Sequence, residues 1–241
     1  MLIYGINAVL EAIRSGRVRE VRVAERASGR VAEAVTAAQH AGIAVRRVQA
    51  QELDRAARGG VHQGVMADVE EARDFSVADL VSGAKGVPLL VVLDGIEDPH
   101  NVGAILRTVD AAGADGVVRQ SRHAAPLGGA AAKAAAGAVS HVKVAEVVNI
   151  ARAVEELKEA GVWTVGLAGD SPKRYDQLDL TVPTAFVLGA EGTGLRRLVR
   201  ERCDWLVSIP MQGHVNSLNV SVAAGVALFE AVRQRGSGSE T

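Results

Sequence analysis

The chain has few of the residues that mark several common protein classes. Cys203 is the only cysteine among 241 residues, which excludes an intrachain disulfide framework and any thiolate-rich zinc site. We expect it to act as a small buried apolar residue. Aromatic residues make up only 3% of the chain. This scarcity argues against a protein that binds single-stranded nucleic acid on aromatic stacking platforms.

A dominant charge and long apolar segments are missing as well. The formal net charge is -1 at pH 7, so the global basic signature of many DNA-binding domains is absent and any RNA site has to be local. No apolar run approaches the roughly 20 residues that a membrane span needs, and the N-terminal residues show helical periodicity rather than a signal-peptide core. The histidines never fall into metal-ligand spacing. We therefore expect a soluble, cytoplasmic protein that binds neither a membrane nor a metal.

Hydrophobic periodicity divides the chain into two α/β domains. Residues 1–70 alternate three helical segments with three strand segments. Residues 71–87 combine mixed charge with weak periodicity, and we interpret them as a linker. Residues 88–235 form the second domain, and residues 236–241, rich in glycine and serine, are predicted to be a disordered tail.

The second domain also alternates strands with helices. Strands are predicted in six apolar segments: residues 89–96, 116–120, 141–147, 162–169, 184–191 and 205–211. Amphipathic or apolar helices are predicted between and after them, the last over residues 217–235. This order predicts a mostly parallel sheet that is covered by helices on both faces.

Three of the predicted strands are followed by unusual polar or glycine-rich sequence, and ligands bind beyond the carboxyl ends of parallel strands. The segments are "DGIEDPHNVGAILRT" from residue 94, "LGAEGTGL" from residue 188 and "IPMQGHVNSLN" from residue 209. In the first, Asn101 either caps a helix or has a functional role. In the second, Glu191 lies among glycines without a P-loop lysine, which suits a ligand with hydroxyls, amines or positive charge. In the third, one of Ser217 and Asn219 can cap the closing helix, and the other is free to hold a substrate.

Arg107 is a further candidate in the first segment. It lies inside the predicted helix between Leu106 and Val109. A cation in such an apolar stretch has to extend toward solvent or meet an anionic partner.

Taken together and in this order, the three segments resemble the signature motifs of the SpoU family of RNA ribose 2′-O-methyltransferases. The N-terminal sequences "YGINAVLEAI" and "VHQGVMADV" resemble the substrate-binding domain of the branch that modifies guanosine in 23S ribosomal RNA. The resemblance covers nearly the whole chain. It implies a knotted (trefoil) α/β methyltransferase domain, S-adenosylmethionine as the cofactor, a homodimer and a small N-terminal RNA-binding domain.

The resemblance also implies which residues form the site. The positions that match the cofactor contacts are Gly189, Ala190, Ile209, Met211 and Leu218. The positions that match the catalytic and substrate-positioning residues are Asn101, Arg107, Glu191, Ser217 and Asn219.

The chemistry of ribose methylation is positioning plus the removal of one proton. The family proposal makes the equivalent of Arg107 the base, but a guanidinium stays protonated in proteins. We interpret Arg107 as the group that anchors the RNA phosphate and polarises the hydroxyl, with the proton leaving to phosphate or water. The predicted function is methylation of a guanosine ribose in 23S ribosomal RNA. The alternatives are a transfer RNA or resistance-type methylase and a non-catalytic RNA-binding assembly factor.

Overall fold

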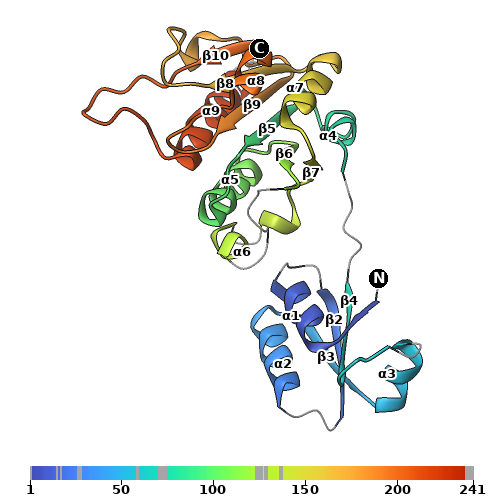
Figure 1. The fold of residues 1–241 in the computed structure, drawn as a ribbon. Helices are drawn as coiled ribbons and strands as arrows, with labels where there is room; N and C mark the ends of the chain where they lie inside the picture. Colours follow the sequence, from blue (N-terminus) through green and yellow to red (C-terminus); the bar gives the residue numbers. More distant parts are fainter. Residues whose placement is uncertain are drawn as a thin grey trace. The chain divides into compact units, whose positions relative to one another are not determined.

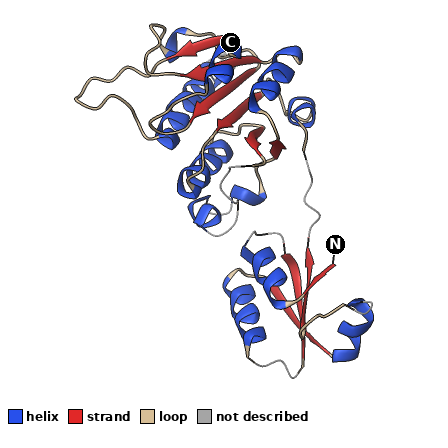
Figure 2. Cartoon of the chain, in the orientation of Figure 1, coloured by secondary structure: helices blue, strands red, loops and turns tan. Residues whose placement is uncertain are grey.

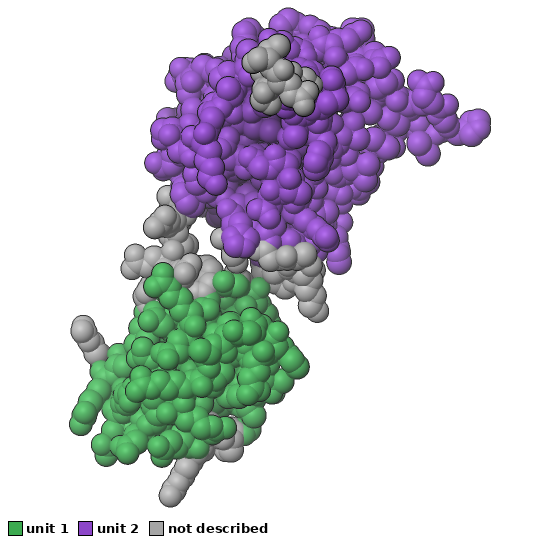
Figure 3. Space-filling view, turned by 180° about the vertical axis from the view of Figure 1, so that it is seen from behind, with its two compact units in different colours: residues 1–73 green, residues 74–241 purple. Residues whose placement is uncertain are grey.

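The computed structural model describes residues 2–14, 16, 18–25, 29–57, 60–69, 75–122, 127, 130–135 and 138–236. The chain forms two compact units, residues 1–73 and residues 74–241 (Figure 3). Each unit has its own sheet and its own hydrophobic core. In the described part of the chain, no helix has both the length and the apolar character that crossing a bilayer requires.

The first unit is a four-stranded mixed sheet in the order β1-β4-β2-β3. Strand β4 runs antiparallel to β1 and β2, and β3 runs parallel to β2. Helices α1 and α2 pack on one core cluster, while α3 contributes Leu53 to a smaller second cluster. The elements are β1 (Leu2–Tyr4), α1 (Ile6–Arg14), β2 (Val18–Ala24), α2 (Arg30–His40), β3 (Ala44–Val48), α3 (Ala50–Ala57) and β4 (Val65–Val69).

The second unit is a six-stranded sheet in the order β10-β8-β9-β5-β6-β7, and every strand pair in it is parallel. In chain order, the first elements of this unit are α4 (Val77–Ser82), β5 (Leu89–Asp94), α5 (Pro99–Ala111), β6 (Gly116–Gln120), α6 (Ala130–Ala135) and β7 (Val144–Val147). The remaining elements are α7 (Ile150–Glu159), β8 (Trp163–Leu167), β9 (Thr184–Gly189), α8 (Arg197–Arg202), β10 (Trp205–Val207) and α9 (Val220–Gly236). Two short 3₁₀ turns lie at residues 138–140 and 175–177.

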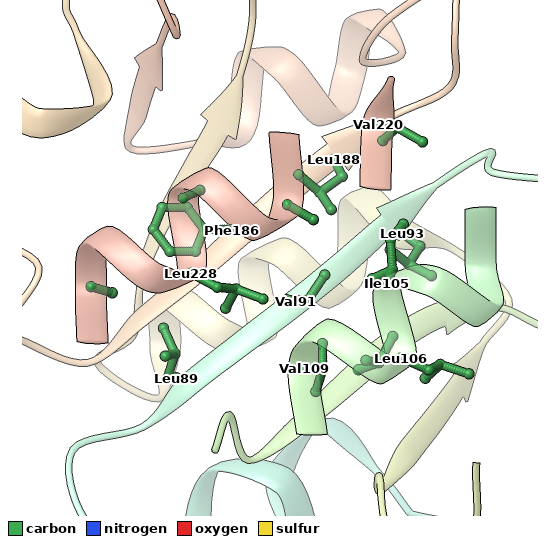
Figure 4. Close-up of a cluster of buried hydrophobic side chains, with 14 of the residues drawn as sticks. Leu89, Val91, Leu93, Ile105, Leu106, Val109, Phe186, Leu188, Val220 and Leu228 are labelled. Atoms are coloured by element: carbon green, nitrogen blue, oxygen red, sulfur yellow. The ribbon is translucent and has the colours of Figure 1, made fainter. Parts of the chain in front are cut away.

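Helices cover both faces of this sheet, as the sequence predicts (Figure 2). Alternate side chains of β5 point to opposite faces: Val91 and Leu93 pack with α5 and α9, while Leu90 and Val92 pack with α4 and α7. Figure 4 shows the first of these cores, in which Phe186 of β9 lies close to α9. Because both faces are buried, the strands read in the sequence as unbroken apolar runs.

The predicted linker is too long, because residues 77–82 form helix α4. Ser76 and Asp79 make a capping box in which the Ser76 hydroxyl accepts from the Asp79 N–H at 3.1 Å and the Asp79 carboxylate accepts from the Ser76 N–H at 2.8 Å. Leu80 is fully buried in the core of the second unit. The S-x-x-D pattern is a helix-start signal that the sequence interpretation missed.

The last predicted strand and the closing helix are shorter than expected. Strand β10 ends at Val207 rather than residue 211, and α9 begins at Val220 rather than residue 217. The intervening loop extends away from the body of the unit in Figure 1. Residues 237–241 of the predicted tail lie outside the described residues, and the trefoil knot remains a prediction.

Cys203 follows α8 and packs at the margin of the second core cluster. Its Sγ donates to the Val199 carbonyl at 3.3 Å. Burial raises the pKa of the Cys203 thiol to about 12. The residue is therefore a neutral packing group, as the sequence suggested.

The C-terminal end of α9 is tied to the start of the sheet by one side chain. The Arg235 guanidinium donates to the carbonyls of Val87 at 2.6 Å, Pro88 at 3.1 Å, Leu180 at 2.9 Å and Val182 at 2.8 Å. Hydrogen bonds from a charged donor are stronger than neutral ones. This single cation thus joins three segments that are distant in the sequence.

We expect Arg235→Ala to lower the free energy of unfolding by about 2 kcal/mol, because it removes four charge-assisted hydrogen bonds from partly buried carbonyls. Urea denaturation followed by circular dichroism measures the change. The control is Arg152→Ala, which removes only the exposed pair with Glu156 and should cost less than about 0.5 kcal/mol. Equal effects of the two substitutions would contradict the role of Arg235.

Candidate functional site

The carboxyl ends of β8, β9 and β10 and the loops that follow them surround a cleft of about 670 Å³. Apolar side chains form part of its wall, and the glycine-rich loop after β9 forms another part. Eight of the ten residues proposed from the sequence line this cleft. They are Gly189, Ala190, Glu191, Ile209, Met211, Ser217, Leu218 and Asn219.

Three polar side chains from three distant segments meet beside the cleft in a hydrogen-bonded triangle. Asn219 Nδ2 donates to Glu191 Oε1 at 2.6 Å and to Asn101 Oδ1 at 2.9 Å. Asn101 Nδ2 donates to the same Glu191 oxygen at 3.1 Å. We call this group the amide–carboxylate triangle. It fixes the loop after β9 against the starts of α5 and α9.

Asn219 has a second role as the cap of α9. Its Oδ1 accepts from the Ser221 N–H at 2.9 Å, the second residue of the helix. An N-cap side chain satisfies one of the free N–H groups in this way. The side-chain oxygen of Asn219 therefore caps the helix, while its NH₂ group serves the triangle.

Asn101 does not cap α5. The cap is Asp98, whose Oδ1 accepts from the His100 N–H at 2.9 Å, with Pro99 as the first helical residue. Asn101 lies one turn further on and is buried, with 7% of its surface exposed. Its amide is therefore available for the triangle.

Two of the predicted site residues are free of such contacts. Arg107 is exposed on α5, and within the described part of the chain it makes no hydrogen bond or ion pair. It satisfies its charge by extending into solvent, and it does not line the cleft. Ser217 is exposed in the loop before α9, three residues ahead of the helix, and likewise has no hydrogen bond to a described residue.

A buried carboxylate supports the glycine-rich loop from the face of the sheet that α4 and α7 cover. Asp94, the last residue of β5, is completely buried and accepts from the Arg196 backbone N–H at 2.8 Å and from its Nε at 2.6 Å. Arg196 also donates to Gln120 Oε1 at 3.0 Å. Sequence reasoning missed this group, because nothing in the pattern pairs residue 94 with a residue about a hundred positions later.

The charged groups of the cleft itself are few. The Arg200 guanidinium donates to both carboxylate oxygens of Asp170 at 2.9 Å, and these hydrogen bonds lower the pKa of Asp170. Both side chains line the cleft, as does Glu191. Among the described residues, no group of three or more His, Cys, Asp or Glu side chains could hold a metal ion.

Close backbone packing shapes the cleft at Gly189. A Cβ added there would collide with the backbone of Gly194 and Leu195, so only glycine lets the two arms of the loop approach each other. Gly192 and Gly194 have φ values of 78° and 68°, in the region that favours glycine. The glycines of "LGAEGTGL" therefore fold the loop back on itself.

The chain belongs to the SpoU rRNA methylase family, whose model matches residues 88–229. A second family model, RNA 2′-O ribose methyltransferase substrate binding, matches residues 2–75. The two matches correspond to the two compact units of the fold.

Individual relatives resemble the chain over nearly its whole length. The 23S rRNA (guanosine-2′-O-)-methyltransferase RlmB of Haemophilus influenzae is 47% identical over 97% of this chain and 97% of the relative. The protein of the same name from Pseudomonas syringae pv. tomato is 46% identical over 97% of this chain and 95% of the relative. The crystal structure of the SpoU methyltransferase AviRb from Streptomyces viridochromogenes in complex with AdoMet matches with a TM-score of 0.66 and 28% identity, over 99% of this chain and 91% of that one.

The residues of the cleft fit S-adenosylmethionine, the cofactor of this family. Leu167 and Met211 supply partly exposed apolar surface suited to an adenine ring, and the closely packed Gly189 leaves backbone groups at the wall. The carboxylate of Glu191, whose partners are neutral amides, suits a ligand that carries positive charge, whereas Asp170 is already paired with Arg200.

We expect the two roles of Asn219 to be separable by substitution. Asn219→Ala removes the cap and the triangle and should lower the free energy of unfolding by about 1–2 kcal/mol. Asn219→Asp keeps a capping oxygen but places a second carboxylate against Glu191. Its loss in free energy of unfolding should therefore become smaller as salt is added, because salt screens the repulsion. Urea denaturation at two salt concentrations measures both effects.

The matched control is Ser217→Ala in the same loop, which removes no hydrogen bond to a described residue and should leave stability unchanged. Wild-type stability of Asn219→Asp at low salt would mean that capping is the whole contribution of this residue.

Proposed function

We propose that this protein transfers the methyl group of S-adenosylmethionine to the ribose 2′-hydroxyl of a guanosine in 23S ribosomal RNA. The observation that carries the proposal is the position of the cleft. It lies where three family motifs meet, in a chain about 46% identical to 23S rRNA methyltransferases over 97% of its length. The substrate-binding match over residues 2–75 supports a separate RNA contact by the first unit.

The cleft residues would hold the cofactor, which supplies an electrophilic methyl group when bound. Gly189, Ile209 and Leu218 would contact it largely through backbone groups. Ala190 and Met211 would line the same pocket. The triangle of Asn101, Glu191 and Asn219 would hold the loops of this pocket in place, so that little ordering is needed on binding.

Exposed polar groups, Arg107 on α5 and Ser217 at the cleft, would position the RNA. Arg107 is free to bind a phosphate through its planar fork of donors, because no described residue competes for it. A guanidinium stays protonated, so Arg107 orients the ribose and polarises the hydroxyl, and the proton leaves to phosphate or water. Ser217 presents a free hydroxyl at the cleft and would contact the nucleotide or cofactor.

The test is transfer of labelled methyl from S-adenosylmethionine to unmodified 23S rRNA, with the modified nucleotide mapped. We expect label at one guanosine 2′-oxygen. Arg107→Ala should slow transfer by about 100-fold through misplacement of the ribose. Arg107→Lys should still be at least about tenfold slow, since a point charge does not replace the fork.

The control for Arg107 is Arg152→Ala, an exposed arginine of α7 on the opposite face of the sheet, which should keep full activity. Full turnover by Arg107→Lys would contradict the bidentate role alone. Absence of methyl transfer by a protein that binds S-adenosylmethionine and 23S rRNA would overturn the proposed activity.

We also propose that the protein is a homodimer formed through α9. Val222 and Phe229 of this helix are both 50% exposed. They are seven residues apart and so lie on one face. Val226 and Val232 extend the same apolar stripe at half-buried positions. An apolar helix face of this kind on a folded surface is typical of a protein interface.

Phe229→Asp should therefore give a monomer, because it places a charge in the apolar interface. Sedimentation velocity at several protein concentrations measures the change. Arg152→Asp, at an exposed position of α7 on the opposite face of the sheet, is the charge control. A wild-type protein that sediments as a monomer would contradict the proposal.

A further inference from the structure

Both tryptophans of the chain lie together on an exposed edge of the second unit. Trp163 begins β8 and Trp205 begins β10, which are neighbouring parallel strands. The ring centroids are 6.2 Å apart with planes inclined at 31°, and the side chains are 46% and 39% exposed. We call the two rings, together with Lys173, the tryptophan surface.

The position of these rings follows from strand alternation. Trp163 lies two residues before Val165, and Trp205 lies two residues before Val207, so both share the sheet face of those buried valines. The buried core cluster on this face includes Val165 and Val207 but neither tryptophan. Each ring buries more than half of its area but leaves a substantial apolar area uncovered, and two adjacent rings of this kind on a folded surface indicate a binding site.

A cation accompanies the aromatic rings. Lys173 Nζ lies 3.8 Å from the centroid of the Trp205 ring, and no carboxylate of a described residue pairs with it. The acidic groups closest to Lys173 in sequence are already engaged: Asp170 pairs with Arg200 at 2.9 Å and Asp176 accepts from Arg174 at 2.6 Å. Asp204, next to Trp205, pairs with Lys158 at 3.0 Å. The surface therefore offers two partly exposed rings, one face of Trp205 being covered by Lys173, and one positive charge that no described carboxylate pairs.

We propose that the tryptophan surface binds unpaired nucleotides of the RNA substrate, with a base stacked on the tryptophans and its phosphate near Lys173. Bases of any sequence stack on aromatic rings, and proteins recognise single-stranded RNA in this way. The proposal rests on the proposed function, because it assigns a further contact to the same RNA.

The tryptophan surface and the cleft share the edge strand β10. Trp205 is the first residue of this strand and Val207, which lines the cleft, is its last, a distance of about 7 Å along a strand. In Figure 1, β10 and β8 lie side by side at one border of the sheet. The proposal therefore places the stacked nucleotides outside the cleft, near the amino ends of these two strands.

The chain provides its own probe, because its only two tryptophans are the ones in question. Tryptophan emission of the full-length protein is titrated with acrylamide, with and without the unmodified 23S rRNA transcript. We expect the RNA to shield the emission from acrylamide severalfold. Trp205→Ala should weaken binding of the transcript by about tenfold, within the range measured for loss of one stacked base.

Further variants separate stacking from folding. Trp205→Phe keeps an aromatic face and should bind RNA nearly as well as the wild type, while Lys173→Gln should weaken binding and reduce its salt dependence by about one charge. Arg152→Gln on α7 is the matched loss of an exposed cation on the other face and should have no effect. The shielding measurement on the unmutated protein holds even where Trp205→Ala does not fold.

The outcomes distinguish this inference from the proposed function. Methyl transfer to 23S rRNA without shielding of the tryptophans overturns the inference alone. RNA-dependent shielding without methyl transfer supports the tryptophan surface and overturns the proposed activity. Emission that is shielded without RNA in proportion to protein concentration would assign the surface to contact between copies of the chain and overturn the inference.

Discussion

The hydrogen bond of 2.6 Å from Asn219 to Glu191 is the contact on which the geometry of the cleft depends. It joins the loop after β9 to the start of α9, and through Asn101 both are joined to α5. These segments are far apart in the chain, and only the parallel sheet brings them to one edge. Loss of either Glu191 or Asn219 would also leave the buried amide of Asn101 with one partner fewer, which costs more than losing a solvent-exposed hydrogen bond.

Asn219 explains why the segment before α9 has more polar side chains than the capping of one helix requires. An asparagine has an acceptor and a donor on one side chain, and here the acceptor caps α9 while the donor holds the triangle. Aspartate or serine would cap equally well but could not also donate two hydrogen bonds. Stability of the closing helix and geometry of the cleft are therefore coupled through a single residue. Ser217 takes part in neither and remains free for a ligand.

Much of the fold could be predicted, because a strand of a doubly covered sheet can be an unbroken apolar run, as in residues 89–93 of β5. Helix α4 was missed because the capping pair Ser76 and Asp79 lies within a charged stretch with weak periodicity. The polar residues of the cleft could be named from local sequence and family resemblance. Their partners could not, since the contact of Asp94 with Arg196 depends on strand order.

Composition gives the number of aromatic residues and says nothing of where they lie. A content of 3% argues against stacking platforms spread over a surface, yet one exposed pair suffices for one base. Parallel neighbours at the edge of the sheet place Trp163 and Trp205 together although they are distant in sequence. Neither ring belongs to the buried core on that face, which Phe186 and Leu228 help to fill, and 39–46% of the rings' area stays exposed. Retaining both rings in the open is therefore best explained by a bound partner.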